Sequence, residues 1–146
     1  MKQFVIFSLS DQDFAIEIES VNEVTESKEI TPVPKSPEEL EGIINLRGEV
    51  MPVINLKRVL KMNMSNKNDS QIMVVGNDDK QVGLMIDYAK DVKDFDEDSI
   101  EQTTSIIQGS QDHYKGVMTI NDNLVLILDI AWLIGNPDYS ISELSK

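Results

Sequence analysis

Short runs of apolar residues, separated by polar turns, recur along the whole chain. The first run, residues 4–7, is continuous, and a polar turn follows it at residues 10–13. The pattern then changes to alternation, with Phe14, Ile16 and Ile18 separated by small or charged residues. A period of two residues is typical of a strand with one buried face. The two runs therefore predict a β-hairpin.

The same pattern occurs a second time, which indicates an internal duplication. Residues 4–7 align with residues 72–75, and the match continues at the same offset to Val24 and Val92. Further along, the offset is slightly larger, so that Gly42 aligns with Gly116. A short insertion between Val92 and Gly116 accounts for the change. Chance similarity between apolar strands is the alternative, but the constant offsets and the matching glycines favour duplication.

Each repeat contains a second predicted hairpin and a short helix after it. The hairpins turn at residues 47–49 and 121–123, and the helices cover residues 56–62 and 130–134. Short strands with frequent turn signals favour small barrels or a sandwich over parallel βαβ units. We therefore predict an all-β protein of two packed barrels. The predicted organisation is two repeats, 3–62 and 71–135, which form the two barrel subdomains, followed by a tail at 138–146.

The composition of the chain excludes several functions. It has 146 residues, 40% of them apolar, which is enough for one domain with a core. A net charge of −13 repels nucleic acid and anionic membrane surfaces. Cysteine is absent, and the apolar run at residues 4–7 is too short for a signal peptide or a membrane span. We therefore expect a soluble, cytoplasmic protein that does not insert into a membrane.

No catalytic or metal-binding constellation is found in the sequence. His113 is the only histidine, lies in a polar stretch, and is expected to be a surface residue. An EF-hand loop starting at Asp94 would need Gly and Glu where Ser99 and Ser105 stand. Trp132 is expected to be a core aromatic. We predict no enzyme activity, no metal and no cofactor; a hydrolase built from carboxylates is the enzymatic alternative.

Residues 42–56, GIINLRGEVMPVINL, carry a resemblance to a known family. The segment resembles the signature of CheW-type chemotaxis coupling proteins, Gly-x-x-Asn-Leu-Arg-Gly-x-x-x-Pro-(Val/Ile)-(Val/Ile)-Asp-Leu. The resemblance extends from the strand at Phe4 to residues 132–134 and includes Asp87. The chain departs from the family at Asn55, which is usually Asp, and at Lys57, which is often Arg.

This resemblance implies a fold, a function and partners. The implied fold is a single domain, 1–146, of two intertwined five-stranded SH3-like β-barrels with a few short helices. The implied function is a non-enzymatic adaptor, recruited to membrane receptor arrays, through which chemoreceptors control the histidine kinase CheA. The implied contacts are the cytoplasmic receptor tips and the C-terminal regulatory domain of CheA. The length favours a stand-alone adaptor. The alternatives are a ligand-binding small-barrel protein and a scaffold in a non-motility kinase pathway.

A receptor site is predicted around Arg47, at a hairpin tip. Its guanidinium is suited to bind a carboxylate or backbone oxygen, and Glu23 is its expected internal partner. Apolar residues at matching repeat positions are expected to line a groove between the barrels for a docking helix. A solubilising turn charge and ordinary core valines are the alternatives. The predicted receptor-binding residues are Val21, Glu23, Val24, Gly42, Arg47, Gly83, Ala89 and Val92.

A kinase site is predicted at the barrel ends. The kinase domain that the resemblance implies has the same two-barrel architecture, so like-to-like contacts between barrel ends are expected. Only one of the two matching turns carries an arginine, so the two ends are expected to differ in affinity. The predicted kinase-binding residues are Gly48, Val50, Met51 and Leu124.

Overall fold

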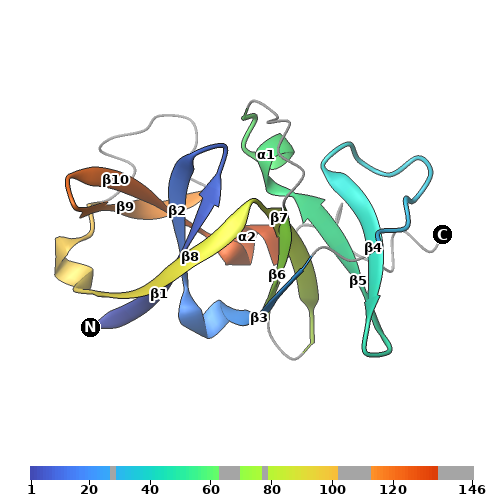
Figure 1. Cartoon of the computed structure of the whole chain (residues 1–146), viewed down its shortest axis with the longest axis horizontal. Coiled ribbons are helices and arrows are strands. Elements are labelled where there is room, and N and C mark those ends of the chain that lie inside the picture. The colour runs from blue at the N-terminus through green and yellow to red at the C-terminus, as the bar shows by residue number, and fades with distance from the viewer. Residues whose placement is uncertain (27–28, 63–69, 77–78, 102–112, 135–146) are drawn as a thin grey trace.

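The computed structural model describes residues 1–26, 29–62, 70–76, 79–101 and 113–134, and most of them lie in strands (Figure 1). The first repeat forms β1 (Lys2–Leu9), β2 (Gln12–Glu17), η1 (Ile18–Ser20), β3 (Val21–Glu26), β4 (Leu40–Leu46), β5 (Glu49–Asn55) and α1 (Leu56–Val59). The second repeat forms β6 (Gln71–Gly76), β7 (Gln81–Ile86), β8 (Tyr88–Phe95), η2 (Glu97–Ser99), β9 (Tyr114–Ile120), β10 (Asn123–Leu128) and α2 (Ile130–Ile134). The predicted all-β class, hairpins and short helices are confirmed, and β3 and β8 are additional strands.

The two repeats exchange strands with each other. Sheet A has the order β8-β1-β2-β10-β9, and sheet B has the order β3-β6-β7-β5-β4. Each sheet therefore combines the first two strands of one repeat with the last three of the other. Repeats 3–62 and 71–135 do not form one barrel each; they form both barrels jointly, which is the intertwined arrangement.

The strand registers follow the two sequence offsets. In β1–β2, Val5 lies opposite Ile16, and in β6–β7 the residues that align with them, Met73 and Leu84, lie opposite each other. The β4–β5 and β9–β10 hairpins match in the same way at the second offset. Hydrogen bonding thus repeats along with the apolar pattern.

Each barrel is closed by the chain that follows its edge strand. Thr31, beyond β3, pairs with Ile43 on β4, and Glu101, beyond β8, pairs with Val117 on β9. Gly42 lies at the first of these crossings with φ +152°, and a Cβ there would lie 2.2 Å from the Thr31 carbonyl oxygen. A side chain would therefore push the closing segment away from β4.

The described residues form three apolar clusters. One lies between the sheets and includes Phe7, Phe14, Met73, Leu84 and Leu133. The second fills barrel A around Phe4 and Met118, and the third fills barrel B around Ile44 and Met51. Successive residues of β1 alternate between the interior of barrel A and the shared cluster, so both faces of this strand are buried. That explains why residues 4–7 are continuously apolar.

Candidate functional site

The edge strand β3 presents two valines toward the other barrel. Val21 lies opposite Val75, and Val24 lies opposite Met73. Directly opposed residues share a face of a sheet, and Val75 and Met73 belong to the cluster between the barrels. The register shifts between Val21 and Glu23, and this bulge keeps the two valines on the same face although two residues separate them.

The edge strand β8 repeats this arrangement in sheet A. Ala89 lies opposite Phe7, and Val92 lies opposite Val5, with the register shift at the equivalent place. We call Val21, Val24, Ala89 and Val92 together the valine face. Val24 and Val92 remain 37% and 44% exposed, so they are not ordinary core residues. The structure thus places all four predicted apolar residues on matching faces of the two edge strands, where Val21 and Ala89 pack against the shared cluster and Val24 and Val92 remain exposed.

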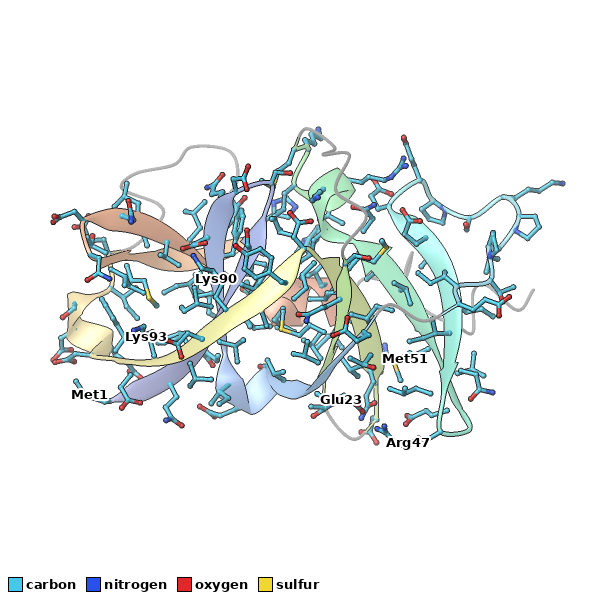
Figure 2. The ribbon with its side chains drawn as sticks, viewed as in Figure 1. Met1, Glu23, Arg47, Met51, Lys90 and Lys93 are labelled. Atoms are coloured by element: carbon cyan, nitrogen blue, oxygen red, sulfur yellow. The ribbon has the colours of Figure 1, made fainter. Side chains whose placement is uncertain are left out.

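The β4–β5 hairpin tip holds Arg47 against Glu23 on β3 (Figure 2). The turn has φ values of +54° at Arg47 and +85° at Gly48, as a two-residue hairpin turn requires, and the Asn45 side chain accepts a hydrogen bond from the Gly48 N–H at 2.9 Å. Both terminal nitrogens of Arg47 donate to the Glu23 carboxylate, which raises the pKa of the guanidinium. The predicted pairing is therefore present in the structure, and it fixes the direction of an exposed cation.

The two glycines of the predicted receptor site are packing positions. Gly42 lies at the closure of barrel B, as described above. Gly83 is buried in β7, where a Cβ would lie 2.8 Å from the Ile72 Cγ2 atom. Both are buried within sheet B, where they position neighbouring strands.

The predicted kinase residues divide into exposed and buried positions. Val50 and Leu124 occupy equivalent places in the two hairpins and are 44% and 67% exposed. A cavity of about 280 Å³ lies beside Leu124 and is lined in part by Val117 and Leu126. Met51 is only 2% exposed, so the prediction that it lies at an apolar strand edge is wrong. It points into barrel B because side chains alternate along β5.

Lys57 and Asp87 form a buried ion pair that was not predicted from the sequence. Lys57 Nζ lies 2.6 Å from Asp87 Oδ1, and both residues are buried. The other carboxylate oxygen accepts a hydrogen bond from the Ser10 N–H at 2.8 Å. The pair ties α1 to the point where the chain crosses from sheet B to sheet A. The sequence signal for this pair was a lysine, Lys57, placed directly after an apolar strand.

The remaining candidates for chemistry do not converge on a site in the described parts of the chain. His113 is half-buried and contacts Trp132, with ring centroids 4.3 Å apart, and Trp132 packs at the rim of the shared cluster. The described residues contain no group of three His, Cys, Asp or Glu side chains that could hold a metal ion. Ser105, which stands where an EF-hand loop starting at Asp94 would need Glu, lies outside the described residues.

Among the described helices, none has the length and apolar character needed to cross a membrane.

Comparisons with known proteins agree with one another. Residues 3–137 match the family of CheW-like domains. The chemotaxis protein CheW of Thermotoga maritima is 31% identical over 136 residues, which cover 92% of this chain and 89% of that protein. The chemotaxis protein CheW of Helicobacter pylori is 32% identical over 134 residues, covering 90% and 81%. A crystal structure of the scaffolding protein TtCheW from Thermoanaerobacter tengcongensis superposes with a TM-score of 0.85 at 33% identity, covering 94% of each chain.

Proposed function

Because this chain belongs to the family of CheW-like domains, we propose that it is a non-enzymatic chemotaxis adaptor that couples chemoreceptor signalling tips to the histidine kinase CheA. The observation that carries the proposal is the valine face, built from matching residues of two edge strands, together with an exposed arginine that Glu23 holds on the other face of β3. Such an arrangement binds and orients a partner and needs no reacting group. Recruitment to receptor arrays follows from the same contacts.

The valine face and the Arg47–Glu23 pair suit an amphipathic helix. A docking helix would bury its apolar stripe against the valine face, where Val24 and Val92 are the most exposed members. Arg47 would bind an oxygen of the helix from the side, because Glu23 already holds its guanidinium in one direction. The apolar contact supplies affinity, and the charged contact selects the orientation of the helix.

Arg47→Asp tests the receptor contact, and Arg58→Asp is its matched control. Arg58 is the other arginine of the chain and pairs with Glu38 and Glu41. We expect Arg47→Asp to abolish capture of a receptor tip fragment with an unchanged circular dichroism spectrum, and Arg58→Asp to keep capture. Retained capture by a folded Arg47→Asp variant would contradict the role of this residue.

Ala89→Met tests the apolar contact. The added atoms protrude from a half-buried position on an edge strand, so receptor affinity is expected to fall more than the melting temperature. In a closed core the same enlargement costs about 1–3 kcal/mol of folding stability. A large loss of melting temperature with normal receptor affinity would make Ala89 a core position.

The kinase contact is proposed at the two hairpin ends, with Val50 and Leu124 as the exposed apolar residues. The two ends differ because one turn holds Arg47 and Gly48, whereas the other holds Asn121 and Asp122. Unlike ends allow one adaptor to bridge two kinase domains. Interfaces that bury less than about 1,200 Å² occur in such transient assemblies.

Val50→Glu and Leu124→Glu, made separately, test this contact by calorimetry against the C-terminal regulatory domain of CheA. Each is expected to weaken binding at least tenfold while the protein remains folded. Ala89→Met is the control, since it should weaken receptor capture and keep kinase affinity. If neither glutamate weakens binding, the barrel ends are not the kinase site.

A further inference from the structure

Two equivalent places in the repeats carry different chemistry. At the offset that aligns Gly42 with Gly116, Lys57 corresponds to Ala131. At the offset that aligns Val24 with Val92, Asp87 corresponds to Glu19. The backbones agree: the Asn55 N–H donates to the Glu39 carbonyl at 2.8 Å, and its counterpart, the Asp129 N–H, donates to the His113 carbonyl at 2.8 Å. The helices α1 and α2 begin directly after these residues. Ala131 therefore stands where the other repeat has a buried lysine.

Ala131 is exposed, and a cavity lies beside its short side chain. In the first repeat, the alkyl chain of Lys57 is buried and its ammonium reaches Asp87. In the second, a cavity of about 410 Å³ is lined by Ala131 and Glu19 together with Ile16, Leu128, Ile130 and Ile134. The aliphatic residues form walls for an alkyl chain, and the carboxylate lies among the lining groups.

The charges around the cavity favour a cation. Glu17 and Lys115 also line the cavity, but they pair with each other at 3.2 Å, and Lys2 binds the same carboxylate at 3.1 Å, so these charges largely offset one another. Glu19 is exposed and has no ion pair within the described part of the chain, although Lys2 attracts its carboxylate at longer range. Asp129, which replaces the neutral Asn55, adds a further negative charge next to Ala131, where it accepts the Ala131 N–H at 3.1 Å. One acidic group at the cavity therefore remains available to a cation.

From this internal comparison we propose that the cavity at Ala131 binds a primary alkylammonium group. The alkyl part lies along Ile16, Leu128 and Ile130, and the ammonium pairs with Glu19, as Lys57 pairs with Asp87 in the other repeat. The group is supplied either by a lysine side chain of a partner protein or by a free aliphatic amine. None of the residues that line this cavity belongs to the valine face or to the hairpin ends, although Ser20 directly precedes Val21.

The first test supplies the missing group within the chain. Ala131→Lys is compared with Ala131→Met, whose alkyl chain is similar but uncharged and whose helix propensity is nearly the same. We expect the lysine variant to melt roughly 2–4 °C higher than the methionine variant at low salt. Adding Glu19→Gln should remove the difference. A lysine variant no more stable than the methionine variant, or a gain that survives Glu19→Gln, would overturn the proposal.

The second test adds the group from outside and uses NMR on the full chain. The probes are n-butylammonium, as a free amine, and N-acetyl-lysine amide, as a peptide lysine, with n-butanol as the neutral control. Saturable shifts of the Ile16, Glu19 and Leu128 amides at millimolar probe are expected from at least one cation, and Ala131→Lys should weaken them at least threefold. The probe that binds better identifies the source. No saturable shift, or equal binding of n-butanol, would overturn the proposal. Neither test involves receptors or the kinase.

Discussion

In sheet B the β4–β5 hairpin turns at Arg47 and Gly48, whereas in sheet A the equivalent β9–β10 hairpin turns at Asn121 and Asp122. All four residues have positive φ, so the backbone of the turn is the same. Only the first turn places a cation against an edge strand, where it pairs with Glu23. The comparison shows that the turn geometry is repeated while its side-chain chemistry differs.

The interiors of the two repeats differ in the same way. Both barrels close at a glycine, Gly42 or Gly116, because a Cβ there would meet the backbone of the closing segment. The ion pair of Lys57 and Asp87, in contrast, has no counterpart, since Ala131 stands at the equivalent position. Backbone requirements therefore recur at both equivalent places, whereas the buried ion pair, which joins the two repeats, occurs at one of them. Four predictions test this distinction.

The largest effect is expected from Met51→Glu. It places a carboxylate in the apolar interior of barrel B, which costs more than about 4 kcal/mol when no partner is available. The neighbouring Val50→Glu faces solvent and should change the free energy of unfolding by about 0.5 kcal/mol or less. Urea denaturation of both variants measures the difference. Similar stabilities would contradict the alternation along β5.

The next effect concerns the buried ion pair. Lys57→Met leaves the Asp87 carboxylate buried without its cation and should cost about 3–5 kcal/mol. The equivalent carboxylate in the other repeat is exposed, so Glu19→Gln should cost less than about 0.5 kcal/mol. Thermal unfolding of both variants makes the comparison. Equal losses would mean that the two places are energetically alike.

A smaller loss is expected from alanine at the two closing glycines. Gly42→Ala and Gly116→Ala each introduce a clash with the closing segment and should cost about 1–3 kcal/mol. Gly42→Ala should be the more damaging, because its φ of +152° is also unfavourable for a side chain. Denaturant midpoints rank the two. The reverse order would show that backbone strain is minor at this crossing.

The smallest effect is the pH dependence contributed by Glu17. Burial by itself raises the pKa of this carboxyl, but hydrogen bonds from Lys2 and Lys115 lower it below its ordinary value of 4.5. A lowered folded-state pKa stabilises the protein above pH 4.5, and the contribution is lost as the pH falls through the folded value. Wild type should therefore exceed Glu17→Gln by about 0.5–1 kcal/mol near neutral pH.

The control for the Glu17 prediction is the pH profile itself. The stability difference between wild type and Glu17→Gln should shrink steadily in acid, and added salt should reduce it near neutral pH. Met85 stands at the equivalent position in sheet B, so no second carboxylate of this kind is expected to contribute there. A difference that grows in acid would have the wrong sign.

The strands that escaped prediction are the two edges, β3 and β8. Both are rich in polar residues, and each contains a bulge that breaks the two-residue alternation. Edge strands expose one side and do not need a regular apolar pattern. The hairpins, in contrast, were predictable because each pairs neighbouring segments through a short turn. The residues of the valine face were predicted from their matching positions in the two repeats. The registers of the edge strands that carry them were not predicted, because each contains a bulge.

The sequence by itself determined the duplication and the turns, because these depend on local spacing, and the motif at residues 42–56 indicated the family. The tertiary structure alone decided which strands join across the repeats, through the parallel pairs β2–β10 and β5–β7. It also decided that Met51 is buried and that Lys57 meets Asp87 of the other repeat. Such contacts join segments that are distant in the chain, and local periodicity carries no information about which distant segment lies opposite.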